Sequence, residues 1–525
     1  MTRVSPDAAA GASADDKTFD VAIVGAGPAG LAAAAEAAEA GVSVLVVDSA
    51  EQPGGQYWRH RSERAGSDDG ALHHGWRDYL ALRGRFDAGI APGAIRYLPG
   101  TSVWMAESAP GGFVLRLAPA YGPGPSPAPT VRATSLVLAT GGYDRQLPVP
   151  GWHLPGVMAA GGIQAFVKQN GALPGRRFVI AGTGPFLLPV AANIAQSGGS
   201  VVSVLESASL AGWLPRAHRA LGVPAKGLEA AGYIAAFARH RIPYRTRSVV
   251  TEILGSGQVE AVRTARVDRD GAVVPGSQRI IEGVDGVGLG WGFTPQLELP
   301  VQLGARTRQD ADGSLVAEVD AEQRSSVPGL YIAGELTGVG GAVLAVLEGA
   351  VAGRAAALTA RGRGGGSAAR TPELRAIARQ RAFARAMHLA HPVPRGWEQH
   401  LHDDTVVCRC EEVRYGALAA ARDTLAGEDS RAQKGVTRAG MGWCQGRVCG
   451  FAVSCIAGAE ESGAEQPGAE RTSTARSGSA PTSSVPMTAA PPVESLRQTM
   501  RRPIAQPIPL ASLATLEPEA ELGRD

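Results

Sequence analysis

The chain has 525 residues, with 51 lysines and arginines against 49 aspartates and glutamates, and a formal net charge of +2. At roughly 100 to 200 residues per domain, this length predicts three or four domains. The charged residues are scattered and nearly balanced, which excludes nucleic acid as the expected partner. Met1 to Lys17 does not resemble a signal peptide, and no apolar run of about 18 residues occurs later. We therefore expect no transmembrane segment and a cytoplasmic location.

The stretch from Asp20 to Asp48 has the pattern strand, glycine-rich turn, helix, strand and acid. In a dinucleotide-binding unit, these glycines allow the sharp turn, bring the backbone close to a pyrophosphate and let the helix pack on the sheet. The terminal acid accepts hydrogen bonds from a ribose diol. The residues expected at the nucleotide are Gly25, Gly27, Pro28, Ala29, Gly30 and Asp48, with Gly55 and Gln56 in the loop that follows.

The run LVLATGGYDRQLPVPGW at residues 136–152 resembles the ATG segment of two-dinucleotide flavoprotein oxidoreductases. The resemblance implies that the backbone of Ala139, Thr140 and Gly141 lines FAD. It also implies a discontinuous FAD-binding domain, residues 19–150 and 286–358, preceded by a disordered arm at residues 1–18. The segment ending at Gly334 and Glu335 resembles the second FAD motif of that family, in which many relatives carry Asp at the position of Glu335.

A second dinucleotide pattern lies within the NAD(P)-binding-like domain that we expect over residues 151–285. Gly182 and Gly184 supply the turn, and Glu206 suits an unphosphorylated ribose. Leu187 occupies the position of the third glycine, where a large side chain is expected to push the helix off the strand or crowd the phosphates. The pattern therefore leaves two interpretations: a site for NAD(P) or another nucleotide, and an inert or altered nucleotide domain.

All five cysteines lie between Cys408 and Cys455. Four of them form a CxC pair and a CxxxxC pair, and four thiolates suit a 2Fe-2S cluster whose sulfurs accept hydrogen bonds from nearby backbone amides. Zinc is the alternative metal, although this spacing departs from that of common zinc fingers. Cys455 follows in an apolar run and is expected to be a buried residue without a ligand role. The predicted metal ligands are Cys408, Cys410, Cys444 and Cys449.

The cysteine region, CRCE and TRAGMGWCQGRVCG, resembles the bacterioferritin-associated ferredoxin-like 2Fe-2S domain, here expected over residues 401–457. The order of segments from Phe19 to Ile456 resembles the large α subunits of opine oxidases, hydrogen cyanide synthase and dye-linked proline or hydroxyproline dehydrogenases. The resemblance implies an α/β fold with two Rossmann-like dinucleotide-binding domains and a small C-terminal helical 2Fe-2S domain. A linker and helix at residues 359–400 and a largely disordered tail at residues 458–525 complete the prediction.

The resemblance implies a heteromeric dehydrogenase in which a sister flavoprotein subunit oxidises the C–N bond of an amino acid, imino acid or opine. This chain would transfer electrons through FAD and the cluster. The alternative is a self-sufficient NAD(P)H-dependent reductase that passes electrons through its cluster to a soluble partner. A redox sensor or scaffold is a third, non-enzymatic hypothesis. The nucleotide domains contain no CxxC dithiol, and the sequence identifies neither a catalytic residue nor the electron acceptor.

Overall fold

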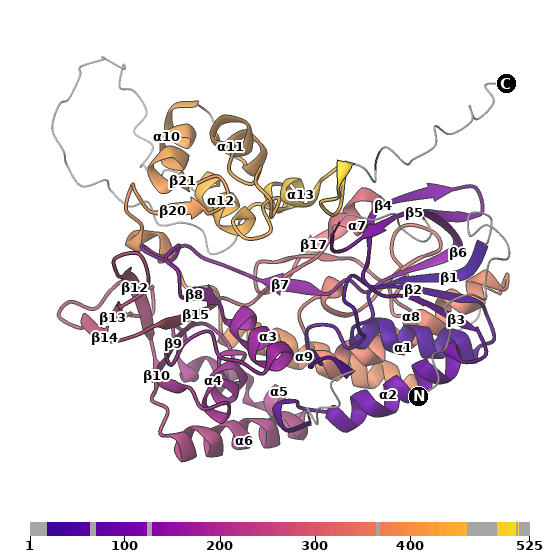
Figure 1. The fold of residues 1–525 in the computed structure, drawn as a ribbon, viewed down its shortest axis with the longest axis horizontal. Helices are drawn as coiled ribbons and strands as arrows, with labels where there is room; N and C mark the ends of the chain where they lie inside the picture. Colours follow the sequence, from indigo (N-terminus) through magenta and orange to yellow (C-terminus); the bar gives the residue numbers. More distant parts are fainter. Residues whose placement is uncertain are drawn as a thin grey trace, which may run out of the picture.

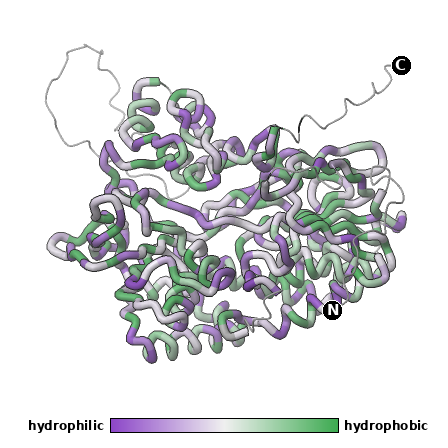
Figure 2. Tube along the Cα trace, in the orientation of Figure 1, coloured by the Kyte–Doolittle hydropathy of each residue, from purple (hydrophilic) through white to green (hydrophobic). Residues whose placement is uncertain are grey.

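The fold is taken from a computed structural model, which describes residues 18–63, 70–122, 129–363, 368–425, 427–458, 491–510 and 513. Residues 1–17 of the expected N-terminal arm lie outside the described residues. The described chain forms two α/β domains side by side and a helical domain above them (Figure 1). Hydrophobic residues concentrate in the strands of the first domain and in the helices packed on them (Figure 2).

The first domain is built on a seven-stranded sheet of order β3-β2-β1-β6-β5-β4, with β19 also paired to β6. β3, β2, β1, β6 and β19 pair in parallel, while β4 and β5 are antiparallel. Both faces of β1 are buried in separate apolar clusters, as a parallel strand covered on two sides requires. The strands are β1 (Thr18–Val24), β2 (Val44–Val47), β3 (Ile95–Leu98), β4 (Thr101–Ala109), β5 (Gly112–Pro119), β6 (Thr130–Leu138) and β19 (Leu330–Ile332).

One face of this sheet is covered by α1 (Pro28–Glu39), α2 (Trp76–Ile90) and α8 (Ala342–Ala360). α1 and α8 pack so closely that a Cβ on Gly349 would lie 2.1 Å from the backbone oxygen of Ala29. Among the described residues, α8 is the one helix long and apolar enough to cross a membrane, and 61% of its apolar window is buried inside the protein. That burial is the pattern of a core helix.

The second domain has a five-stranded sheet of order β11-β10-β9-β15-β8. β15 pairs in parallel with both β8 and β9, so residues 286–290 complete the second sheet. The domain boundary expected at residue 286 is therefore wrong, because strand pairing over more than 100 positions decides which sheet β15 joins. The elements are β8 (Val157–Ala159), α3 (Ala160–Asn170), β9 (Arg177–Gly182), α4 (Leu187–Gln196), β10 (Ser200–Glu206), η4 (Leu210–Arg216), α5 (Ala217–Leu221), α6 (Pro224–His240), β11 (Tyr244–Thr246) and β15 (Gly286–Gly290).

Shorter elements connect the two domains or extend them. β7 pairs with β16 where the chain passes between the domains, and β12, β13 and β14 form an antiparallel sheet on the second domain. These elements are η3 (Gly70–Leu72), β7 (Gly142–Asp144), β12 (Ser248–Leu254), β13 (Ala261–Arg266), β14 (Arg279–Glu282), β16 (Phe293–Pro295), α7 (Glu298–Gln302), β17 (Thr307–Gln309), β18 (Leu315–Ala317) and η5 (Gly334–Thr337).

The helical domain carries the cysteines and follows the expected linker helix, α9 (Thr371–Ala390). Within the stretch 458–525, for which the sequence predicts a largely disordered tail, residues 491–510 are ordered and contain a helix, α13. The sequence predicts disorder for most of the tail, and residues 491–510 are a described exception, in which Leu496 and Met500 of α13 are buried. Residues 459–490, 511–512 and 514–525 of the predicted tail lie outside the described residues. The elements are η6 (Trp397–His400), β20 (Val406–Cys408), β21 (Val413–Arg414), α10 (Tyr415–Leu425), α11 (Ser430–Thr437), α12 (Gly450–Ala457) and α13 (Val493–Met500).

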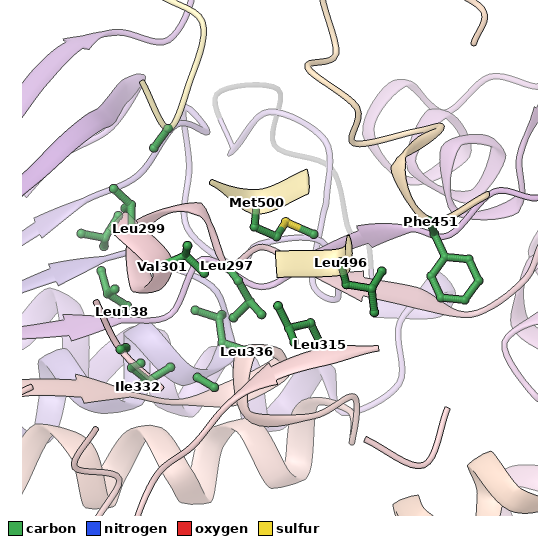
Figure 3. Packing of buried hydrophobic residues seen from close by; sticks show 14 of the residues in the cluster. Leu138, Leu297, Leu299, Val301, Leu315, Ile332, Leu336, Phe451, Leu496 and Met500 are labelled. Carbon is green, nitrogen blue, oxygen red and sulfur yellow. The ribbon is translucent and has the colours of Figure 1, made fainter. Parts of the chain in front are cut away.

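α13 joins the helical domain to the first domain through one hydrophobic core. Leu496 and Met500 point toward Leu297 and Leu315 of the first domain, and Phe451 of α12 lies at the other end of the same cluster (Figure 3). A four-residue spacing puts Leu496 and Met500 on one face of the helix. The ordered tail therefore buries an apolar face that the two domains alone would leave exposed.

Candidate functional site

One cavity of about 1900 Å³ runs between the two nucleotide-binding domains and reaches the cysteine domain. Its volume exceeds the roughly 300 to 1,000 Å³ of most small-molecule sites, so it has room for a dinucleotide and more. Most of the predicted nucleotide-binding residues line it. They are Gly25, Gly27, Pro28, Ala29, Asp48, Gly55, Gln56, Ala139, Thr140, Gly141, Gly184, Gly334 and Glu335.

The glycines of the first turn have separate structural reasons. Gly25 has φ +105°, and a Cβ there would lie 2.4 Å from the backbone oxygen of Ala139. Gly30 does not line the cavity, because it packs inward, where a Cβ would lie 1.8 Å from the oxygen of Gly25. Gly27 differs from both, since its nearest neighbour would be the Cα of Gly55 at 3.7 Å. Gly25 and Gly30 thus shape the turn, and Gly27 keeps its cavity face open.

The N-terminus of α1 opens into this cavity. Gly27 is the N-cap, and the first turn carries no acidic side chain and no side-chain cap, so its N–H groups remain available to an anion. Asp48 accepts hydrogen bonds from the N–H groups of Ala26 and Ala50, the latter at 2.6 Å. Burial raises the pKa of Asp48, and these two N–H donors oppose the shift. The acid therefore holds the turn while it faces the cavity.

Glu335 lies at the other side of the same cavity, beside the N-terminus of α8. Its carboxylate accepts a hydrogen bond from the N–H of Gly341 at 2.9 Å. Burial raises the pKa of Glu335 to about 7, against the opposing effect of that N–H. Arg381 of α9 donates to the oxygen of Gly338 at 2.8 Å and pairs with the buried Glu348. The linker helix thus fixes the loop that carries Glu335.

Leu187 does not crowd the second nucleotide turn. Its side chain is fully buried and packs over β15, where a Cβ on Gly290 would lie 3.1 Å from Leu187 Cδ2. Gly182 also depends on this strand, because its Cβ would lie 1.7 Å from the oxygen of Gly290. Leu187 does not line the cavity, so its side chain stays out of that space. α4 begins only at Leu187, three residues after Gly184, whereas α1 begins directly after Gly27, which agrees with the expected displacement of the helix.

Glu206 is fully buried and does not line the cavity. It accepts hydrogen bonds from the N–H groups of Gly184 at 2.8 Å and Ala208 at 2.9 Å and from the hydroxyl of Thr183 at 3.0 Å. His391, after the end of α9, lies 3.4 Å from its second oxygen. The protein itself occupies the oxygens of Glu206, which differs from the ribose-binding role that the sequence predicts.

The cysteine domain brings the four predicted ligands together as two pairs. The Cys449 thiol donates a hydrogen bond to the Cys408 sulfur and lowers the pKa of Cys408 to about 6. Cys410 lies beside Cys444, and burial together with that neighbouring thiol raises the pKa of Cys410. Cys408 and Cys449 are buried, Cys410 is exposed, and Cys444 lines the cavity. Cys455 is buried away from these pairs, as expected.

The four cysteines lie in one region but are not arranged as a metal-ion site. In the part of the chain that the structure describes, no three Cys, His, Asp or Glu side chains converge as the ligands of one ion. Gly442 packs directly against Cys410, where a Cβ would lie 2.2 Å from the Cys410 Cβ. The region thus holds four free thiols close to one another.

A buried charge cluster that the sequence does not reveal joins three segments beside Cys444. Glu298 of α7 is 2% exposed and binds Arg447 at 2.9 Å and Arg502 at 2.8 Å. Arg447 belongs to the cysteine domain and also donates to the backbone oxygen of Ala505. These residues lie about 50 to 200 positions apart, so no local pattern could have paired them. The cluster holds the cavity wall, the cysteine domain and the tail together.

Comparison with known proteins gives the family. The model for pyridine nucleotide-disulphide oxidoreductases matches residues 19–355. An opine oxidase subunit from Rhizobium meliloti strain 1021 is 35% identical over 456 residues, covering 84% of this chain and 92% of that protein. The hydrogen cyanide synthase subunit HcnB from Pseudomonas aeruginosa is 31% identical over 448 residues, covering 81% and 90%.

A solved structure agrees on the fold. The L-proline dehydrogenase of P. horikoshii covers 86% of this chain, and this chain covers 75% of it, with a TM-score of 0.58 at 19% identity. The α/β architecture with Rossmann-like domains is thereby confirmed, as is the resemblance that the sequence motifs suggest. The chain is an FAD-dependent oxidoreductase and belongs to the pyridine nucleotide-disulphide oxidoreductase family.

Proposed function

We propose that this chain is the electron-transfer subunit of a heteromeric dehydrogenase or oxidase that acts on the C–N bond of an amino acid, imino acid or opine. The observation that carries the proposal is the shared cavity: Cys444 and Arg447 of the cysteine domain line the same space as Gly27 and Asp48 of the flavin domain. A flavin and a cysteine-bound centre in these positions would be neighbours, as an electron relay requires.

The flavin domain supplies binding and orientation. The N-terminus of α1 offers N–H groups to the pyrophosphate, and Asp48 faces the ribose end. When bound, FAD supplies two-electron chemistry that can be divided into single-electron steps. The closely packed strands and α8 exclude water from beneath the turn.

A 2Fe-2S cluster is the centre that we propose for the four thiols. Such a cluster takes four cysteines, two on each iron, and the proposal is supported by the closeness of Cys408, Cys410, Cys444 and Cys449 to one another. A site for one zinc ion would need four ligands around a single point. The CxC and CxxxxC spacing, which departs from that of common zinc fingers, supports iron and sulfur over zinc.

The partner in this proposal is a sister flavoprotein subunit that carries the amine-oxidising site. The relatives that cover most of this chain are named as subunits, which supports a heteromeric assembly. Co-purification from the native host would identify that subunit. The second nucleotide domain, with Glu206 occupied internally, argues against the alternative of a stand-alone NAD(P)H-dependent reductase. The cytoplasmic location stays a prediction.

Counting flavin and iron on variants of the full chain tests the proposal. We expect Cys444→Ser to lose most of the iron and the paramagnetic signal of the reduced cluster while it retains FAD. The matched control, Cys455→Ala, removes a buried thiol outside the two pairs and should keep the wild-type iron content. Zinc in place of iron after anaerobic purification, or equal iron in both variants, would contradict the cluster.

A further inference from the structure

Lys168 is a buried cation in the cavity, and no described acidic residue forms an ion pair with it. The side chain belongs to α3 of the second domain and is 7% exposed. Its ammonium donates to the backbone oxygen of Tyr57 at 3.2 Å. Among the described residues no carboxylate affects this group, and burial lowers the pKa of Lys168 to about 8. The group therefore still carries a positive charge at neutral pH.

A second lysine of the same cavity shows the contrast. Lys226 of α6 also lines the cavity, but its ammonium forms an ion pair with Glu229 at 2.7 Å. A buried charge is costly unless an opposite charge and hydrogen bonds compensate it. Lys226 has that compensation within the protein. Lys168 has one carbonyl oxygen as its partner among the described residues, and an anion in the cavity would supply the compensation that Lys226 receives from Glu229.

The face of α3 that carries Lys168 has the character of a binding surface. Gly161, Gln164 and Lys168 lie at helical spacing and all line the cavity. Gln164 is 8% exposed and sits one turn before Lys168, where its amide can donate to the same group. The carboxylate of Asp144 accepts a hydrogen bond from the N–H of Gly161. Gly161 lies seven positions before Lys168, which separates the two residues by roughly 10 Å along the helix.

The position of Tyr57 connects Lys168 to the flavin turn. Tyr57 lies two positions after Gly55. Gly55 packs against the first glycine turn so closely that a Cβ on Gly55 would lie 2.8 Å from the Cα of Gly27. The ammonium thus meets the loop that covers the pyrophosphate end of the first domain. Arg59 on that loop donates to Gln56 and Gln169, which ties the loop to α3.

We propose that Lys168, with Gln164, forms a binding site for an anionic oxygen group, phosphoryl or carboxylate, of a ligand in this cavity. The group has two possible sources: the pyrophosphate of FAD, or a separate anion bound beside it. This site rests on the cavity and does not depend on the proposed iron–sulfur cluster. Loss of iron would overturn the proposed electron relay and leave this inference standing.

The test uses the full chain with and without FAD, and inorganic pyrophosphate and oxalate as probes. We compare Lys168→Gln with the matched control Lys226→Gln, which removes a charge that Glu229 already compensates. Lys168→Gln should weaken the binding of the preferred probe or of FAD about tenfold or more. Lys226→Gln should bind both like the wild type. Binding is measured by calorimetry and by the shift of Tm with ligand concentration.

The measurements with and without FAD distinguish the two possible sources of the anion. If the probe competes with FAD and FAD binding is weakened, the anion is the FAD pyrophosphate. If the probe binds equally well to the FAD-loaded protein, a second ligand uses Lys168. Lys168→Arg keeps the charge and should retain most of the binding, which separates a charge effect from misfolding. Wild-type affinities in Lys168→Gln, or equal losses in Lys168→Arg and Lys168→Gln, would overturn the proposal.

Discussion

Single residues in the first nucleotide turn divide into those that shape the fold and those that meet the ligand. Gly30 is enclosed by backbone, since a Cβ would lie 1.8 Å from the oxygen of Gly25. Gly27 has space for a Cβ but presents that face to the cavity. The same residue type therefore has two functions within three positions, and substitution should separate them.

We expect Gly27→Ala to fold and to bind FAD about tenfold more weakly, because its methyl group would enter the space of the pyrophosphate. Gly30→Ala should instead lower Tm by several degrees, because backbone must move to accept the methyl group. Thermal unfolding and FAD titration of both variants give the answer. Gly232→Ala on α6, where a Cβ meets nothing within 4 Å, is the control and should leave both unchanged or improve stability. Equal changes of Tm and of FAD affinity in Gly27→Ala and Gly30→Ala would show that the two glycines do not have separate functions.

Glu335 makes the stability of the folded chain depend on pH. Burial raises its pKa from 4.5 to about 7, so the folded chain holds this proton more tightly than the unfolded chain. The resulting stability is complete below pH 4.5 and is lost as pH rises through 7, with a total of about 3 kcal/mol. The flavin-free protein should accordingly be more stable at pH 5 than at pH 8 through this group.

Glu335→Gln removes the titrating proton, so the difference in Tm between pH 5 and pH 8 should shrink in the flavin-free chain. Glu51→Gln, an exposed acid that also lines the cavity, is the control and should keep the wild-type difference. An unchanged pH dependence in Glu335→Gln would show that other groups control stability over this range.

At the scale of elements, the C-terminal segment 491–510 locks the cysteine domain onto the flavin domain. Leu496 and Met500 fill the shared core, while Arg502 reaches Glu298. The oxygen of Trp104 on β4 accepts a hydrogen bond from the N–H of Ala505 at 2.7 Å. Apolar burial, an ion pair and backbone hydrogen bonds thus act together over one short segment.

Removal of residues 491–525 should expose the α12 face and leave Glu298 with one arginine. Burying two apolar side chains contributes about 3 to 6 kcal/mol, so the cysteine domain should become sensitive to protease before the flavin domain does. Removal of residues 511–525 alone leaves these contacts intact and is the matched control. Cleavage followed by mass spectrometry locates the sites. Identical cleavage patterns in the two truncated chains would show that the segment does not hold the domains together.

At the scale of the whole molecule, the two dinucleotide-binding domains are unequal. Asp48 lines the cavity, whereas Glu206 is buried and has His391 against it. Trp213 donates to the other nitrogen of His391 at 3.0 Å, so η4 and the chain after α9 cover this edge together. The second domain keeps its Rossmann architecture but lacks an open acid for the ribose of NAD(P)H.

NADH should therefore leave the flavin absorbance of the isolated chain unchanged over minutes at millimolar concentration, while dithionite bleaches it. The physical reason is that Glu206 is fully buried with His391 against its carboxylate, whereas Asp48 reaches the cavity. Stopped-flow absorbance near the flavin maximum provides the measurement. Rapid bleaching by NADH would favour the self-sufficient reductase in place of the electron-transfer subunit.

Sequence alone determined those features that depend on neighbours along the chain. The glycine turn before α1, the ATG segment and the paired cysteines all encode their chemistry within a few residues, because turn geometry and ligand spacing are local. From these motifs, the sequence predicts the family, and most of the nucleotide-binding residues that it predicts line the cavity. The family relatives confirm the flavoprotein and leave the cluster as a proposal.

Tertiary structure alone decided the features that depend on distant partners. Gly290 makes the space for Leu187, His391 lies against Glu206, and the burial of Lys168 without an acid depends on where α3 meets the flavin domain. Packing and electrostatics act over a few ångströms in space, whatever the separation in sequence. For that reason the motifs locate the cofactors, while the closed second domain, the ordered tail and the buried lysine emerge only in the folded chain.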